Sequence, residues 1–229
     1  MNKIVVANMK MNLTIDLIKE YLNEINNNEV IYFPTAIYIP YFIEKNLKVG
    51  IQNISCYEKG NHTGEISALQ VSSLNIKYAI VGHSETNDNS SNINKKLKLC
   101  LKYDIIPILC IGEKSLTDDI KTVLKKQLDK YLKDIKNINK IMLAYEPEWM
   151  IGTNNNIEIS KLEEIISFIK EFIYQKYKIS DIIVLYGGSI NSHNIKYINK
   201  IPYLDGILVG NNSTNIKEFL KIIEVALNQ

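Results

Sequence analysis

Short apolar segments alternate with longer amphipathic segments along the whole chain, and this alternation constrains the fold more than any other feature. Eight such pairs occur within 229 residues. Because the short segments are apolar throughout, we expect strands that are buried on both faces, as parallel sheets require. The strand candidates are residues 4–7, 30–33, 49–51, 78–81, 105–110, 141–145, 182–186 and 206–209.

Each strand candidate is followed by a segment with helical spacing, so the pattern predicts repeated βαβ crossovers. The helix candidates are residues 16–26, 38–45, 67–74, 93–103, 118–132, 160–177, 193–199 and 216–227. Eight units in a chain of this length fit an α/β fold of the closed (β/α)₈ barrel type, as a single domain over residues 1–229. An open doubly wound sheet is the competitor, but no Gly-x-Gly-x-x-Gly follows the first strand, which disfavours its dinucleotide-binding form.

Positive and negative side chains nearly balance, with 27 Lys and Arg against 25 Asp and Glu. This gives no basis for a nucleic-acid surface or a basic membrane patch. The three cysteines are odd in number and widely spaced, which argues against a disulfide framework or a zinc site. The N-terminal apolar run is too short for a signal peptide, and no run is long enough to cross a bilayer. We therefore expect a cytoplasmic protein.

Glu146 is the most informative single residue. It directly follows the strand candidate 141–145 and precedes Pro147. A carboxylate at the end of a buried strand loses hydration and has no obvious local partner, whereas catalytic groups occupy this position in parallel α/β proteins. From this window alone, a capping or salt-bridged glutamate at the start of a loop is an equally good interpretation.

Two further strand candidates end in polar residues that suit acid–base chemistry. Asn8 and Lys10 lie two positions apart after the first strand, so both can point the same way. A lysine there presents a cation to an anionic substrate, although Lys10 taken alone is better interpreted as a surface residue. His83 follows the fourth strand, where a neutral imidazole beside a carboxylate forms an acid–base pair, although a lone histidine is more often structural. His62 and His193 are expected at the surface.

The last two strand candidates end in glycine-containing turns, residues 186–189 and 209–213. Glycine lets backbone N–H groups approach a ligand closely. The loops after strands seven and eight of a barrel frequently bind phosphate. Each motif alone also fits an ordinary tight turn, but their occurrence at these two places favours an anion site.

These residues together resemble the triosephosphate isomerase family. The matching segments run in family order over nearly the whole chain. They are residues 8–12, 52–53, 63–67, 82–85, 110–113, 144–147, 149, 151–153, 186–189, 205–206 and 208–210. The resemblance implies a TIM barrel. Because the chain is shorter than most bacterial and eukaryotic members, the helices after strands two, three and seven are expected to be trimmed.

The resemblance also implies a chemistry. The substrate would be a three-carbon ketose or aldose phosphate, as in glycolysis and gluconeogenesis. Glu146 would be the base that removes a proton from the carbon beside the carbonyl, and neutral His83 would polarise that carbonyl. Lys10 would stabilise the enediolate, with Asn8 and Glu85 positioning it. No metal or organic cofactor is implied.

The remaining roles implied by the resemblance concern phosphate, closure and assembly. Backbone groups at four positions would hold the phosphate dianion: Gly152, Ser189, Gly210 and Asn211. A lid would exclude water and press Ile151 and Leu208 against Glu146. The lid residues would be Pro147, Trp149, Ile151 and Thr153. The long loop 53–66 would bring Thr63 to the partner subunit's Asn8 and Glu85 in a homodimer, and a tetramer is the alternative.

The chain departs from the family pattern at three places. Thr86 and Asn87 stand where arginines usually follow Glu85, so a buried ion-pair network near Glu85 and Glu113 would be missing or rebuilt. Residues 154–156 replace the usual small residues at the end of the lid, and Asn211 replaces a glycine. Two other functions therefore stay open from sequence: an isomerase of a four-carbon sugar phosphate, and a catalytically impaired barrel that serves as a binding module.

Overall fold

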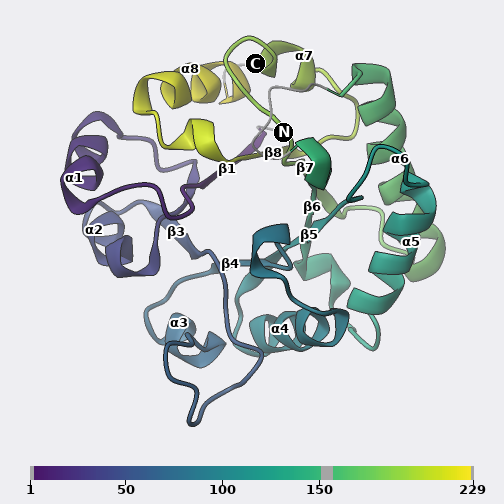
Figure 1. Cartoon of the computed structure of the whole chain (residues 1–229), viewed down its shortest axis with the longest axis horizontal. Helices are drawn as coiled ribbons and strands as arrows, with labels where there is room; N and C mark the ends of the chain where they lie inside the picture. Colours follow the sequence, from purple (N-terminus) through teal and green to yellow (C-terminus); the bar gives the residue numbers. More distant parts are fainter. Residues whose placement is uncertain (1–2, 151–156, 228–229) are drawn as a thin grey trace.

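The structure, a computed structural model, describes residues 3–150 and 157–227. Its strands form a closed parallel barrel in which each strand pairs with the next along the chain and β8 pairs with β1. Figure 1 shows the helices arranged as a ring around these strands. The predicted (β/α)₈ barrel is therefore confirmed, while the assignment of residues 1–229 to one domain stays a prediction.

The strands lie close to their predicted positions. They are β1 Ile4–Asn8, β2 Ile31–Phe33, β3 Lys48–Ile51, β4 Tyr78–Val81, β5 Ile106–Ile111, β6 Met142–Tyr145, β7 Ile183–Tyr186 and β8 Gly206–Val209. Parallel pairing brings their carboxyl ends to one rim; Ala7 of β1, for example, pairs with Val209 of β8. Each residue that follows a strand is thereby brought to the same face of the barrel.

The α-helices confirm the expected trimming, because the three shortest follow β2, β3 and β7. They are α1 Ile15–Glu24, α2 Ile39–Glu44, α3 Ala68–Ser73, α4 Ser90–Lys102, α5 Ile120–Tyr131, α6 Ile159–Tyr177, α7 Ile195–Ile198 and α8 Ile216–Leu227. Single 3₁₀ turns also occur: η1 Ala36–Tyr38, η2 Ser84–Thr86, η3 Ile138–Lys140, η4 Glu148–Met150 and η5 Asn211–Ser213. Within residues 3–150 and 157–227, no helix is long and apolar enough to span a bilayer.

One predicted boundary was wrong. The helix α4 begins at Ser90, three residues before the predicted start at Ile93. Its polar first turn carries no apolar spacing, so periodicity placed it in a loop. The side chain of Asn89 accepts a hydrogen bond from the backbone N–H of Asn92 and caps this turn, as asparagine does at helix starts.

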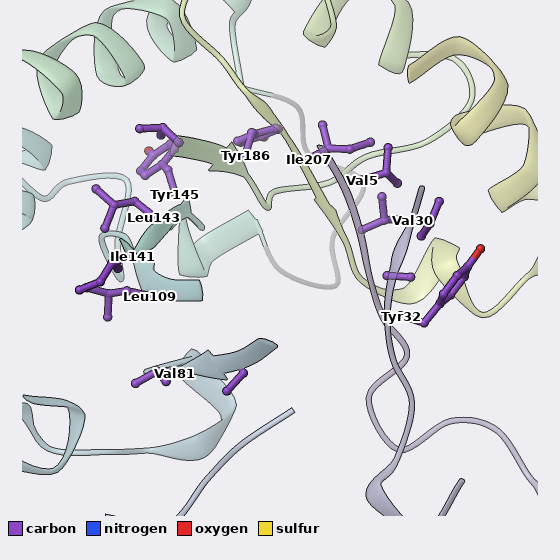
Figure 2. Packing of buried hydrophobic residues seen from close by; sticks show 14 of the residues in the cluster. Val5, Val30, Tyr32, Val81, Leu109, Ile141, Leu143, Tyr145, Tyr186 and Ile207 are labelled. Atoms are coloured by element: carbon purple, nitrogen blue, oxygen red, sulfur yellow. The ribbon is translucent and has the colours of Figure 1, made fainter. Parts of the chain in front are cut away.

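The core has two layers, because successive strand residues point to opposite sides of the barrel wall. Outward residues such as Tyr32 pack between the strands and the helices, and Figure 2 shows several of them. Inward residues such as Phe33 fill the barrel itself. Both layers are buried, which explains why the strand sequences are apolar without alternation. The filled interior leaves room for a ligand only at the rim.

Gly50 on β3 makes room for the largest inward ring. A Cβ atom at this position would lie 2.2 Å from Cε1 of Phe33. Gly50→Ala should therefore lower the free energy of unfolding by about 1–3 kcal/mol through overpacking, measured by urea denaturation. Adding Phe33→Leu to Gly50→Ala should recover part of that loss. A single variant as stable as the wild type would contradict the contact.

Candidate active site

A cavity of about 310 Å³ opens at the carboxyl-terminal rim of the barrel. The three side chains singled out by the sequence, from the loops after β1, β4 and β6, all line it: Lys10, His83 and Glu146. Asn8 and Leu208 line it as well. The remaining lining residues are Met150, Gly187, Gly188, Ser189, Ile190, Asn191, His193, Gly210, Asn211 and Asn212. The predicted convergence of distant residues on one cavity is therefore present.

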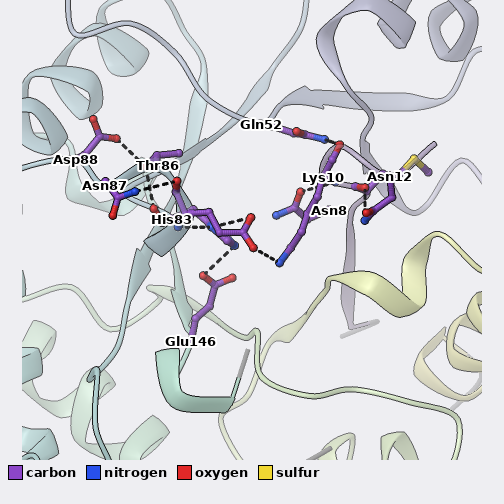
Figure 3. A network of polar contacts seen from close by, with 11 residues as sticks. Asn8, Lys10, Asn12, Gln52, His83, Thr86, Asn87, Asp88 and Glu146 are labelled. Carbon is purple, nitrogen blue, oxygen red and sulfur yellow. Dashed lines mark hydrogen bonds and ion pairs between the residues drawn. The ribbon is translucent and has the colours of Figure 1, made fainter. Parts of the chain in front are cut away.

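Lys10 is fixed at the cavity by its backbone and by its ammonium group. Its φ of 52° lies in the left-handed region, which is unfavourable for lysine and needs local support. The backbone N–H donates to Oδ1 of Asn8 at 3.2 Å, and the carbonyl accepts from Nε2 of Gln52 at 2.8 Å and Oγ1 of Thr35 at 3.0 Å. The ammonium pairs with Glu85 at 2.6 Å, as the resemblance implied (Figure 3).

His83 is buried, and a hydrogen bond orients its ring at Nδ1. The backbone N–H of Glu85, in the turn η2, donates to Nδ1 of the imidazole at 3.2 Å. An imidazole that accepts at Nδ1 carries its proton at Nε2 and is neutral. Nε2 lies 3.7 Å from Oε2 of Glu146, and Figure 3 shows the two side chains facing each other. This arrangement provides an N–H donor aimed into the cavity.

Glu146 immediately follows β6, and its backbone N–H donates to the carbonyl of Ile111 at 2.8 Å. Its carboxylate is buried, and Oε2 has no hydrogen-bond partner within the described part of the chain. Burial raises the pKa of this carboxyl above its usual range, although the nearby His83, the Cys110 thiol and Lys10 act in the opposite direction. A poorly solvated carboxylate with a free oxygen is suited to accept a proton.

The loop after β7 approaches Glu146 so closely that only glycine fits. A Cβ atom at Gly187 would lie 2.6 Å from Cγ of Glu146, and one at Gly188 would lie 2.1 Å from Oη of Tyr186. The expected anion-binding residues Ser189, Gly210 and Asn211 line the same cavity from the loops after β7 and β8. A ligand bound in the cavity would therefore lie next to the backbone of these two loops.

Asn211 begins the turn η5 and is not among the described residues with positive φ. The tolerance of asparagine for left-handed backbone therefore does not explain why it can replace glycine here. A backbone in an ordinary region accepts a side chain without strain, and the Asn211 residue still borders the cavity.

The start of the predicted lid is anchored to a buried carboxylate that sequence reasoning did not assign. Glu113 is fully buried, and its carboxylate accepts from Nε1 of Trp149 at 2.8 Å and from Oη of Tyr145 at 3.0 Å. Its carbonyl accepts from the backbone N–H of Glu148 at 2.9 Å. The sequence did contain one sign of this role: Glu113 is an acidic residue two positions after β5, at the same rim as Glu146.

The other predicted lid residues, Ile151, Gly152 and Thr153, lie outside the described residues, as do residues 154–156. His193 is exposed, as predicted, but it also lies at the cavity rim, which its polar surroundings in the sequence did not indicate. In the sequence, only the position of His193 in the loop after the seventh strand indicated a place at the rim. Within the described residues, no group of three or more His, Cys, Asp or Glu is arranged to hold a metal ion.

The loop between β3 and α3 carries Thr63 on its exposed tip. The backbone N–H of Ser55 donates to the carbonyl of Ile66 at 2.8 Å, which closes the two ends of the loop. Figure 1 shows the loop extending beyond the ring of helices. Thr63 does not line the cavity of its own chain, so its predicted role depends on a second copy.

The fold and the cavity define a (β/α)₈-barrel protein with a small polar site at the carboxyl ends of its strands, the class in which barrel enzymes place their chemistry. The sequence model of the triosephosphate isomerase family matches residues 3–226. The chain belongs to this family.

Curated relatives named triosephosphate isomerase agree with this assignment. The protein of Wigglesworthia glossinidia brevipalpis is 34% identical over 244 aligned positions, which cover 97% of this chain and 95% of the relative. That of Ureaplasma parvum is 36% identical over 239 positions, covering 97% and 98%. That of Mycoplasmopsis agalactiae is 39% identical over 188 positions, covering 78% and 70%.

The buried charge of Glu146 should reduce stability at neutral pH. Its folded-state pKa is raised above the unfolded value, so protonation favours the folded state and that contribution is lost as pH rises through the folded pKa. Glu146→Gln should therefore melt at a higher temperature than the wild type at pH 7.5. Below the ordinary glutamate pKa of about 4.3 the advantage should disappear. Glu148→Gln, at a half-buried neighbouring carboxylate, is the control and should show a smaller change. Equal melting temperatures of wild type and Glu146→Gln at pH 7.5 would contradict the prediction.

Proposed function

We propose that the protein interconverts dihydroxyacetone phosphate and glyceraldehyde 3-phosphate through an enediolate, as an aldose–ketose isomerase of glycolysis and gluconeogenesis in the cytoplasm. One observation carries this proposal: the ammonium of Lys10, the imidazole of His83 and the buried carboxylate of Glu146 line a single small cavity. Membership of the triosephosphate isomerase family supports the same substrate. The cavity size suits a three-carbon phosphate.

Glu146 acts as the base. It removes a proton from the carbon beside the carbonyl and returns it to the former carbonyl carbon, while the hydroxyl proton moves from one substrate oxygen to the other, so the aldehyde and ketone exchange places. Because burial raises its pKa, the carboxylate gains more from binding a proton than a solvated one would. Its free Oε2 faces the cavity side occupied by His83 and is available for the transfer.

His83 and Lys10 stabilise the charge that develops on the substrate oxygens. The Nε2–H of His83 donates to the carbonyl oxygen and its neighbour, which become negative as Glu146 takes the proton. The ammonium of Lys10 lies at the same cavity and adds a fixed positive charge. Asn8 holds the backbone N–H of Lys10, so the strained residue keeps this position. His83 also transfers the hydroxyl proton between the two substrate oxygens, so hydrogen moves only among the substrate, Glu146 and His83, and the proposal needs no metal or organic cofactor.

The phosphate end of the substrate lies between the loops after β7 and β8. Backbone N–H groups at Ser189, Gly210 and Asn211 bind the dianion, and Gly152 of the lid completes this set. Closure of the lid excludes water from the enediolate, which would otherwise expel phosphate. Pro147 and the Trp149–Glu113 hydrogen bond hold the first hinge.

Catalysis should depend on the Glu146 carboxylate and not on nearby acidic groups. Glu146→Gln should lower kcat by about 10²–10⁴-fold in a coupled assay of either triose phosphate, because the amide cannot accept the proton. Glu148→Gln is the matched control and should keep most of the activity. Full turnover by Glu146→Gln would refute the assigned base. If the wild type has a higher kcat/KM on a four-carbon sugar phosphate than on either triose phosphate, the four-carbon compound is the substrate instead.

A homodimer is also part of the proposal, with the loop between β3 and α3 as the contact. This loop presents exposed Thr63 and Tyr57, and Met11 beside the catalytic Lys10 is 89% exposed. An apolar side chain exposed this far next to a catalytic residue is suited to cover by a second copy. Thr63 would then approach Asn8 of the partner subunit and Glu85 of the partner subunit.

Light scattering should give twice the monomer mass for the wild type at micromolar concentration. Thr63→Arg should shift the protein toward monomer and lower activity together, because a long cation would not fit a packed interface. Lys59→Arg, a like-charge change on the same loop, is the control. A wild type that is monomeric and fully active would contradict the dimer, and a mass of four chains would favour the tetramer.

A further inference from the structure

A buried cation outside the catalytic cavity belongs to Lys96 on α4, which is only 4% exposed. Its ammonium lies 2.8 and 2.6 Å from the two carboxylate oxygens of Asp88 and 2.8 Å from Oδ1 of Asn53. A buried ammonium is unfavourable unless it is paired and hydrogen-bonded, so these three contacts form one unit. The proposed chemistry makes no use of this unit.

On one side, the unit reaches the loop that carries His83. Oδ2 of Asp88 lies 2.9 Å from Oγ1 of Thr86, and the same hydroxyl lies 2.8 Å from the carbonyl oxygen of His83. One hydroxyl proton is thus shared between two acceptors. The backbone N–H of Thr86 also donates to the His83 carbonyl at 2.9 Å. Figure 3 shows Asp88, Thr86 and His83 in this succession.

On the other side, the unit reaches the loop that carries Lys10. Asn53 directly follows Gln52, whose Nε2 donates to the carbonyl of Lys10 at 2.8 Å and to that of Phe33 at 2.8 Å. Lys96 therefore joins the loop after β3 to the loop after β4. The loop after β4 carries His83, and Gln52 in the loop after β3 supports the backbone of Lys10. Both proton-donating side chains of the cavity are therefore connected to Lys96.

We propose that the buried Lys96–Asp88 pair, acting through Thr86 and Asn53, is a positioning device that sets His83 and Lys10 relative to each other. The inference rests on the proposed isomerase function. It also accounts for the departure at Thr86 and Asn87: the turn lacks the expected arginines, and Lys96 of α4 supplies the cation beside it. Lys96 and Asp88 form an ion pair beside this turn, whereas Glu113 accepts hydrogen bonds from Tyr145 and Trp149 and pairs with no cation among these contacts.

The geometry assigns the Thr86 hydroxyl a specific part. It connects the ion pair to the His83 carbonyl, and a substitution can remove this connection without changing a charge. Loss of this link would leave the imidazole in place but less constrained. Small misplacement of a catalytic group lowers the rate of the chemical step more than it lowers substrate binding.

Thr86→Val and Thr86→Ser are the decisive pair of variants. Valine keeps the shape and removes the hydroxyl, whereas serine keeps the hydroxyl. Thr86→Val should lower kcat by about 10-fold while KM for either triose phosphate stays within about twofold, and Thr86→Ser should keep kcat within about twofold of the wild type. Unchanged kcat in a folded Thr86→Val protein overturns the proposal, as does an equal loss in both variants.

A second comparison tests the ion pair itself and guards against misfolding. Lys96→Met combined with Asp88→Asn removes both charges together, so no unpaired buried charge is left. This double variant should show the same loss of kcat at nearly constant KM, whereas Lys102→Met, at an exposed ion pair on the same helix, should not. A lower melting temperature with normal kcat would make the pair purely structural. A wild type without triose phosphate turnover would instead refute the proposed function.

Discussion

Closure of the sheet by pairing β8 with β1 is the constraint on which the rest of this structure depends. Parallel strands in one closed ring deliver their carboxyl ends to one rim, so the residues after β1, β4 and β6 must meet there. The inward side chains fill the barrel below that rim, which confines the cavity to the loops. The barrel topology, and not any single residue, therefore sets the location of the site.

The two buried carboxylates at the rim, Glu113 and Glu146, have different roles because their surroundings differ. Glu113 accepts hydrogen bonds from Tyr145 and Trp149, so its negative charge is satisfied and it serves as an anchor. Glu146 leaves one oxygen without such a donor among the described residues, and burial raises its pKa. The same functional group is therefore inert at one position and poised to accept a proton at the other.

The eight-unit barrel and most element boundaries were predictable, because apolar runs and helical spacing are local properties of the chain. The start of α4 was not, since its polar first turn depends on a cap at Asn89 and not on periodicity. Lys10, His83 and Glu146 were found because each lies within three residues of the end of a strand candidate. The contacts of Lys96, and the hydrogen bonds that Glu113 accepts from Trp149 and Tyr145, were not predicted because the partners lie far away along the chain.

The sequence by itself therefore determined the strands, the helices, their order and the residues at the strand ends, since side-chain periodicity and turn chemistry act over a few neighbours. Only the tertiary structure decided which of these distant groups touch: Lys96 with Asn53, and Trp149 with Glu113. It also decided which of the buried charges is left unsatisfied. Contact distance, hydration and pKa depend on packing in three dimensions, and no local pattern encodes them.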